Sequence, residues 1–275
     1  MTTIVEAVAV GMLVMLAGTL PRNALFAANL AVVPQVPWGV PVVAVYLWFF
    51  WRFLGGTGSA PDTREYRRNG LRANTVSGAV WIWSLVMGTL GIVALVLGLR
   101  VANLMVALPA QELPDLSAIP RVTVWGMLLA SAPIAGLVEE AAFRGYMQGP
   151  IERVAGLPVA ILITGTMFAV AHLDFTPILW PYYVAVAALY GVITYLARSI
   201  WPAVVLHTAG NLYSNVDLLL HGRAEWQAPA AAAGTIWSRG VDRSFVVLVL
   251  GLALATGATV WAGFVLRRAA RRRES

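Results

Sequence analysis

The chain has 275 residues, of which 59% are hydrophobic and 12% charged, and its mean hydropathy is +0.75. A soluble domain carries about a quarter charged residues, so this composition excludes an ordinary soluble protein. The net charge is +6, and the absence of cysteine excludes disulfides and thiolate metal sites. All 19 basic residues are arginines that gather beside apolar segments, so we interpret them as membrane-topology signals and expect no nucleic-acid partner.

Apolar segments of around 20 residues recur along the chain, the length needed to cross a hydrocarbon core of about 30 Å. We therefore predict an all-α fold: one integral membrane domain over residues 1–275, built as a transmembrane bundle of about eight helices. The N-terminal segment lacks a basic region and an A-x-A-like cleavage site, so it reads as a first span and not as a signal peptide. The predicted spans are 3–20, 36–54, 77–98, 122–143, 155–173, 177–197, 201–220 and 244–266.

The arginines predict an orientation, because cytoplasmic loops of membrane proteins are enriched in basic residues. With a cytoplasmic N-terminus, thirteen arginines fall inside and six outside. Those inside are Arg52, Arg64, Arg67, Arg68, Arg72, Arg144, Arg153, Arg198, Arg267, Arg268, Arg271, Arg272 and Arg273; those outside are Arg22, Arg100, Arg121, Arg223, Arg239 and Arg243. Eight spans also return the C-terminus inside, so we expect a multi-pass protein of the cell membrane with both termini cytoplasmic.

Two adjacent glutamates and an arginine end the fourth predicted span, in the stretch VEEAAFRGYMQGP. Ionisable side chains inside a membrane cost about 2.5–3.5 kcal/mol each on insertion scales, so they need a partner or a function. Glu140 and Arg144 are four residues apart and can form an ion pair on one helix face, an ordinary structural brace. Glu139 lies about 100° around the helix from Glu140. It is either a solvated helix end or a spare carboxylate available for chemistry.

Two further spans carry histidines. His207 and Asn211 share one face of the seventh span, and Phe168 and His172 share one face at the end of the fifth. A carboxylate and an imidazole can activate water, and a second histidine with an asparagine can donate hydrogen bonds to an oxyanion. Taken singly, His172 also fits a helix-end histidine, and His207 with Asn211 fits an interhelical hydrogen-bond pair. No serine or threonine is placed as a nucleophile in these motifs.

A divalent metal such as zinc stays open as a cofactor, because Glu139, His172 and His207 could ligate one, although the HExxH helix of soluble zinc proteases is absent. The predicted spans place the three candidate residues at different depths in the membrane. They place Glu139 near the cytoplasmic end of the fourth span and His172 near the outer end of the fifth, whereas His207 should lie on the cytoplasmic side.

The three motifs together resemble the CAAX prenyl protease and bacteriocin-processing (CPBP, or Abi) family of intramembrane proteases. The family pattern is EExxxR, FxxxH and HxxxN on separate membrane helices. Here the matching blocks are Glu139 to Arg144, Phe168 to His172 and His207 to Asn211, in the family order. The resemblance covers roughly residues 122–215, the predicted catalytic core helices.

The resemblance implies a helical membrane fold with a CAAX-protease-like core and a cavity open to the cytoplasmic side. It implies that Glu139 and His172 activate a water and that His207 and Asn211 stabilise the oxyanion, with Glu140 and Arg144 in support. The implied activity is that of an intramembrane endopeptidase, glutamate-dependent or metal-dependent, whose partners are the lipid bilayer and a membrane protein or peptide substrate. The substrate's identity and the oligomeric state are not predicted. The alternatives are a proton-coupled transporter and a non-catalytic scaffold or immunity protein.

Overall fold

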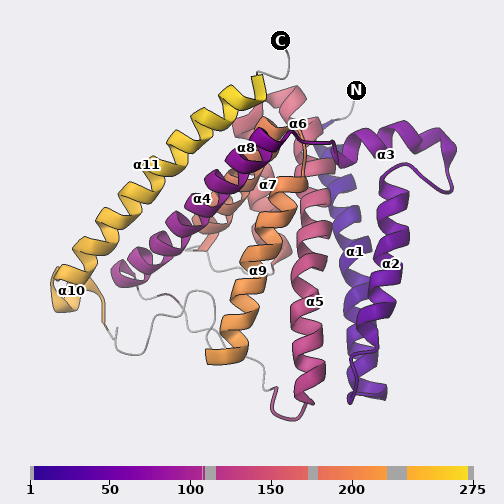
Figure 1. The fold of residues 1–275 in the computed structure, drawn as a ribbon, viewed down its shortest axis with the longest axis horizontal. Helices are drawn as coiled ribbons and strands as arrows, with labels where there is room; N and C mark the ends of the chain where they lie inside the picture. The colour runs from indigo at the N-terminus through magenta and orange to yellow at the C-terminus, as the bar shows by residue number, and fades with distance from the viewer. Residues whose placement is uncertain (1–2, 107, 109–115, 173–178, 222–233, 272–275) are drawn as a thin grey trace.

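The computed structural model describes residues 3–106, 108, 116–172, 179–221 and 234–271 (Figure 1). These residues form helices and connecting loops without a strand, which confirms the predicted all-α fold. The helices are α1 (Ile4–Val32), α2 (Gly39–Leu54), the 3₁₀ turn η1 (Pro61–Thr63), α3 (Arg64–Leu71), α4 (Gly78–Met105), α5 (Arg121–Glu139), the π-helix η2 (Glu140–Met147), α6 (Gln148–Ala155), α7 (Leu157–Ala171), α8 (Trp180–Ala197), α9 (Trp201–His221), α10 (Ile236–Arg239) and α11 (Arg243–Arg271).

Each predicted span corresponds to a helix, but four of the helices end later than predicted. α4 ends at Met105 and not at 98, so Arg100 is helical, and α11 ends at Arg271 and not at 266. The first span was expected to end at residue 20, whereas α1 continues through Pro21 to Val32, so Arg22 is helical and not in a loop. The fourth was expected to end at residue 143, whereas α5, η2 and α6 run on continuously to Ala155. Residues 173, 177–178, Arg223, Arg272 and Arg273, which enter the predicted spans or the topology, lie outside the described residues.

Five helical units among the described residues are long and apolar enough to cross a membrane: α1, α4, the unit from Arg121 to Ala155, α8 and α11. The apolar helices α2 and α7 are shorter. α9 has 21 residues but falls in neither group, since it carries His207, Asn211 and Asp217. The chain is therefore a multi-pass membrane protein, and its orientation stays a prediction.

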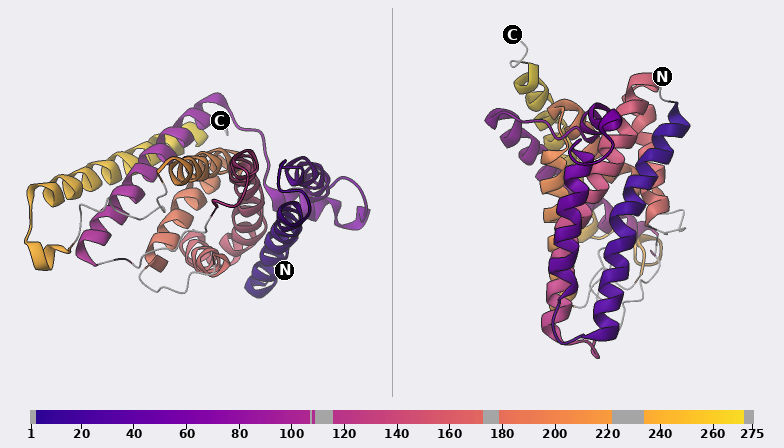
Figure 2. Two further views of the ribbon diagram at one scale, coloured as in Figure 1. Left: turned by 90° about the horizontal axis from the view of Figure 1, so that it is seen from below. Right: turned by 90° about the vertical axis from the view of Figure 1, so that its right-hand side faces the viewer.

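The helices form a bundle with α1 and α2 on one flank and α4 and α11 on the other (Figures 1 and 2). α5 packs along α9, and α7 packs along α8, between these two flanks. The long helices α4 and α11 lie against each other and slant away from the rest of the bundle (Figure 1). The start of α1 and the end of α11 lie at the same end of the bundle, the end at which α3 lies.

Asn29 joins α1 to α2 in the buried part of the first flank. Its side chain is fully buried, donates to the carbonyl oxygens of Val33 and Val36 at 2.9 Å, and accepts from the backbone N–H of Gly39 at 2.6 Å. The amide thus bonds to the carbonyl at the end of α1, to a second carbonyl in the turn that follows, and to a donor at the start of α2; helix ends leave such groups without internal partners.

Replacing Asn29 with alanine is expected to lower the free energy of unfolding by about 3 kcal/mol, because three hydrogen bonds are lost and buried backbone groups are left unpaired. Thermal unfolding in detergent measures the change. Asn23→Ala is the control, since Asn23 is exposed and bonds only to the side chain of its neighbour Arg22 among the described residues. Equal stability of Asn29→Ala and Asn23→Ala would contradict this role.

Close helix contacts place the polar stretch of the fourth span in the middle of the bundle. A β-carbon added at Gly18 of α1 would overlap the side chain of Val138, and one added at Gly136 of α5 would overlap Thr208 of α9. Only glycine permits such an approach of two helix backbones. α9 is therefore held against α5 one turn before Glu139.

α8 separates the two halves of the bundle interior. Tyr182, Ala185, Leu189 and Val192 face an apolar cavity of about 480 Å³ between α4, α8 and α11. Tyr183 and Tyr190, seven residues apart, point to the other side, toward the histidines of α7 and α9. The polar stretch and the apolar cavity are thus on opposite faces of one helix.

Candidate active site

The glutamates and the arginine lie midway along one 35-residue helical unit, at its change from α5 to η2. All eight residues of η2 are buried. Pro150 follows shortly after, and a proline ring clashes with the carbonyl of the residue four positions earlier, here Tyr146. The wider π-turn can take up that misfit, and such turns are frequent at functional sites. Because the helix continues to Ala155, Glu139 is far from both of its ends.

Glu140 and Arg144 form the predicted ion pair, with 3.3 Å between Oε1 and Nη1 and both side chains fully buried. The guanidinium carbon also lies over three rings, at 5.9 Å from the centroid of Phe143, 5.1 Å from Phe168 and 5.5 Å from Tyr190. Attraction between a cation and the faces of aromatic rings is strengthened when water is excluded. Arg144 is therefore held by one carboxylate and three rings.

His207 lies between the two glutamates. Its Nδ1 is 2.7 Å from Oε1 of Glu140, and its Nε2 is 3.6 Å from Oε2 of Glu139. The imidazole is buried, and the ring of Tyr190 stacks on it with 5.3 Å between centroids and 16° between planes. Glu140 is thus shared between Arg144 and His207, and Glu139 faces the second nitrogen of the same imidazole.

Glu139 is the less engaged of the two carboxylates, as its position on the helix predicted. Among the described residues Arg144 pairs with Glu140 alone, and Oε2 of Glu139 is buried without a hydrogen-bond partner. Its contact with His207 is longer than a hydrogen bond. This carboxylate oxygen is therefore available to a water or a substrate atom.

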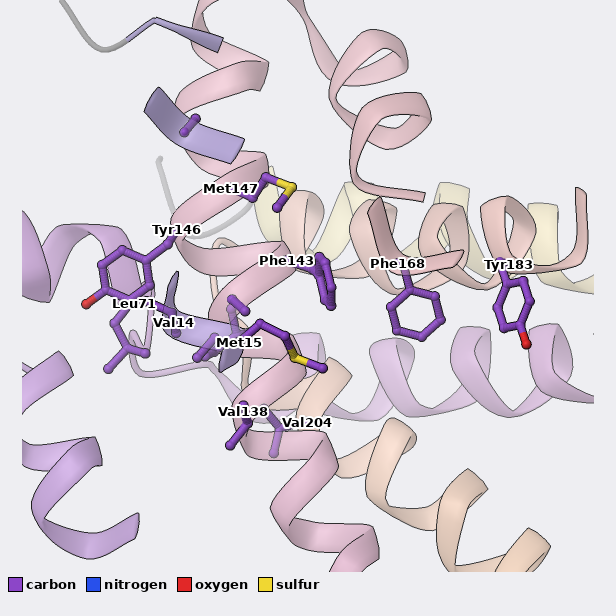
Figure 3. Packing of buried hydrophobic residues seen from close by; sticks show 14 of the residues in the cluster. Val14, Met15, Leu71, Val138, Phe143, Tyr146, Met147, Phe168, Tyr183 and Val204 are labelled. Carbon is purple, nitrogen blue, oxygen red and sulfur yellow. The ribbon is translucent and has the colours of Figure 1, made fainter. Parts of the chain in front are cut away.

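His172 lies at the C-terminal end of α7, apart from the glutamates. Its Nδ1 is 2.8 Å from the carbonyl oxygen of Phe168, and its exposed side chain contacts the rings of Phe168 and Tyr183 at 4.4 and 5.0 Å between centroids. An Nδ1–H donated to a carbonyl leaves Nε2 as the basic nitrogen. The ring of Phe168 lies between the two histidines, with its centroid 6.2 Å from that of His207 (the row Phe143, Phe168, Tyr183 is visible in Figure 3).

Asn211 follows His207 by one turn of α9 and is half-buried. Within the part of the chain that the structure describes, neither His172 nor Asn211 forms an ion pair or hydrogen bond with the glutamates or with His207. The structure thus brings Glu139, Glu140, Arg144 and His207 into contact, while His172 adjoins them through Phe168.

Sequence reasoning missed two residues of this site, Tyr190 and Gln148. Tyr190 contacts both His207 and Arg144, and Gln148 is fully buried one turn after Arg144. Their spacing carried a signal: Tyr190 is two turns from Tyr183, and Gln148 continues the four-residue step from Glu140 and Arg144. Such spacing places Tyr190 and Gln148 at the site only after Tyr183, or Glu140 and Arg144, are known to face it.

The residues present do not fit a metal ion as they stand. No group of three or more His, Asp or Glu side chains arranged to hold a metal is found among the described residues. Both nitrogens of His207 face carboxylate oxygens, and His172 is separated from them by Phe168.

Comparison with known proteins gives one match. Residues 121–213, about a third of the chain, match the family model described as type II CAAX prenyl endopeptidase Rce1-like. The matched segment runs from the start of α5 into α9 and includes all six predicted site residues. No curated protein and no solved structure matches the chain.

Proposed function

We propose that this chain, which carries a type II CAAX prenyl endopeptidase Rce1-like domain over residues 121–213, is an intramembrane endopeptidase that hydrolyses a peptide bond of a membrane-associated substrate. The geometry of Glu139 and His207 supports the proposal independently of the family match. A buried, partly engaged carboxylate, Glu139, lies 3.6 Å from a histidine nitrogen in the interior of a membrane helix bundle. Such a pair can take a proton from water and return it to a leaving group.

The charges of the cluster support this use. With His207 carrying a proton on both nitrogens, the cations His207 and Arg144 balance the anions Glu139 and Glu140. A buried charge is tolerated when it is paired, so the cluster can hold an ionised Glu139 without a net charge. Glu140 fixes the orientation of the imidazole through Nδ1, which leaves Nε2–H directed to the side of Glu139.

In the proposed reaction Glu139 removes a proton from a water molecule as the water oxygen attacks the carbonyl carbon of the scissile peptide bond. The resemblance assigns His172 to orient that water through Nε2, which requires the Phe168 side chain between the two histidines to move. The tetrahedral intermediate then collapses, the carbon–nitrogen bond breaks, and Glu139 delivers its proton to the leaving amine. The products are a new carboxylate and a new amine, and Glu139 regains its starting charge.

His207 and Asn211 are the proposed oxyanion donors. Nε2–H of His207 lies beside Glu139, and Asn211 follows on the same helix by one turn. Donors held in place before the reaction stabilise the negative charge that develops on the carbonyl oxygen, and one such donor contributes about 10²–10³ in kcat. The matched family model is described as a CAAX prenyl endopeptidase, so prenylated peptides are the first substrate class to examine.

The test uses the purified full chain in liposomes, with a farnesylated peptide, an acylated peptide and the same peptide without an anchor. In H₂¹⁸O we expect one cleaved bond and one ¹⁸O atom in the new carboxylate, detected by mass spectrometry, with anchored peptides preferred. Asn211→Ala should lower kcat by about 10²–10³ with a smaller effect on KM, because a donor to the transition state is lost.

The other interpretations give different results. Intact peptides together with counter-ion-dependent uptake into proteoliposomes would indicate a transporter. Full function of Asn211→Ala in cells that lack the natural protein would indicate a scaffold that does not need turnover. Thr208→Ala is the matched control on α9, since Thr208 lies next to His207 and faces Gly136 of α5.

A further inference from the structure

Four polar side chains follow one face of the helix that carries the site, from the buried centre to one end of the bundle. Glu140, Arg144, Gln148 and Glu152 are spaced by four residues, and we call them the polar ladder. Glu140, Arg144 and Gln148 are fully buried, whereas the side chain of Glu152 is 13% exposed. The ladder therefore joins the candidate site to the bundle surface near α3.

Direct contacts link parts of the ladder. Glu140 pairs with Arg144 at 3.3 Å, Nε2 of Gln148 donates to Oε2 of Glu152 at 3.2 Å, and Glu152 pairs with Arg72 at 3.0 Å at the surface end. Gln148 also donates to the carbonyl oxygen of Gly191 on α8 at 3.0 Å. Arg72 in turn donates to the carbonyl oxygen of Arg144 at 3.4 Å.

Polar atoms of the ladder exceed the partners that the protein supplies. Among the described residues, no hydrogen-bond partner is found for Oε2 of Glu140, for Nε, Nη1 and Nη2 of Arg144, or for Oε1 of Gln148, and all five atoms are buried. Buried polar groups in proteins are nearly always bonded to protein or to ordered water. These five atoms belong to three successive members of the ladder, and Nη1 of Arg144 has only its 3.3 Å ion-pair contact with Oε1 of Glu140.

The opposite side of the same helix differs. The hydroxyl of Tyr146 lies 2.9 Å from the carbonyl oxygen of Leu54 and 2.8 Å from that of Arg67, so it is satisfied by protein. Tyr146 points away from Phe143 (Figure 3). Met147 packs against Gly11 of α1. Within η2 and α6, the buried side-chain polar atoms without a hydrogen-bond partner thus all belong to the ladder.

We propose that ordered water molecules follow the polar ladder from the Arg72–Glu152 ion pair to Glu140 and His207, and that this path supplies water to the site. Two steps of the ladder are direct contacts, and the remaining step, from Arg144 to Gln148, covers about 6 Å along the helix. One bridging water with two hydrogen bonds of about 2.8 Å spans that distance. The use of this water in hydrolysis rests on the function proposed above, whereas the path itself does not.

Hydroxyl-radical footprinting with synchrotron X-rays tests the path, because radicals made from bound water label the side chains beside it. Two tyrosines serve as a matched pair: Tyr190, 5% exposed and beside Arg144, and Tyr146, 2% exposed and away from the ladder. In the full chain in nanodiscs we expect Tyr190 to be labelled at least about fivefold faster than Tyr146, since water is bound beside only one of them.

Two variants interrupt the ladder. Gln148→Leu removes the side-chain amide of Gln148. Gly191→Ala places a β-carbon 2.7 Å from Oε1 of Gln148, which displaces only the end of a flexible side chain and leaves the helix fold intact. Both should reduce labelling of Tyr190 to the rate of Tyr146. Met147→Leu, on the α1 side of the same helix, should leave it unchanged.

Equal labelling of the two tyrosines in the natural chain would overturn the proposal. So would undiminished labelling of Tyr190 in folded Gly191→Ala and Gln148→Leu, because water would then reach Tyr190 from the substrate side. Labelling is measured without substrate, so a chain that shows the expected labelling but cleaves no peptide contradicts the proposed function alone. Cleavage with undiminished labelling in both variants overturns the path alone.

Discussion

Glu139→Gln is expected to reduce kcat by as much as about 10⁴-fold, the upper range for loss of a general base, with little change in KM. Glutamine has the same shape but cannot accept a proton from water or return one to the leaving amine. Because Oε2 of Glu139 has no hydrogen-bond partner among the described residues, the substitution should also leave the fold intact. Initial rates on the anchored peptide and thermal unfolding of the same samples measure both effects.

Glu6→Gln is the matched control, since Glu6 lies near the start of α1 and bonds there only to the backbone N–H of Thr3 among the described residues. Glu139→Asp should recover part of the activity, because a carboxylate is restored at a changed distance from His207. Turnover of Glu139→Gln at the rate of the natural chain would refute the assignment of Glu139 as the base.

Glu140→Gln is expected to lower the free energy of unfolding by about 3–5 kcal/mol, the cost of removing one partner of a buried ion pair. The substitution leaves Arg144 fully buried with aromatic rings and no carboxylate, and it leaves Nδ1 of His207 facing a neutral amide. Unfolding in mixed detergent and denaturing-detergent micelles measures the change. Activity should fall as well, since the orientation of His207 depends on Glu140.

The double variant Glu140→Gln, Arg144→Gln separates charge from packing. It removes both charges, so it should be more stable than Glu140→Gln alone even though more atoms are changed. Glu65→Gln, on the exposed surface of α3, is expected to change stability by less than about 0.5 kcal/mol. A Glu140→Gln chain as stable as Glu65→Gln would contradict the structural role of the pair.

The helical bundle was predictable because composition and segment length alone determine which stretches can cross a bilayer. The boundaries were less predictable where polar residues interrupt a helix that nevertheless continues. α1 passes through Pro21 and Arg22, since a membrane helix tolerates proline when neighbouring helices satisfy its backbone. The stretch after Phe143 was expected to leave the membrane helix, but it is the rest of the buried π-helix η2 followed by α6, with Arg144 paired to Glu140 of the same helix.

Local spacing predicted the Glu140–Arg144 pair and the freedom of Glu139, since both follow from positions on one helix. It could not predict that His207 would contact both glutamates, because this depends on the close packing of α5 against α9. Because the fourth helix continues to Ala155, Glu139 does not lie near the end of its span. The conflict of depth between Glu139 and His172 is therefore smaller than the predicted spans implied. His172 remains the residue for which sequence resemblance says more than the geometry shows.

The location of the ion pair within one helix has a consequence for how the chain is made. Glu140 and Arg144 enter the membrane together and can neutralise each other before α9 has been synthesised. His207, on α9, comes 67 residues after Glu140 in the chain. The local pair thereby lowers the penalty of about 2.5–3.5 kcal/mol that each isolated charge would meet during insertion. Glu140 is therefore neutralised within its own helix during insertion, and the contacts of both glutamates with His207 form only after α9 is in place.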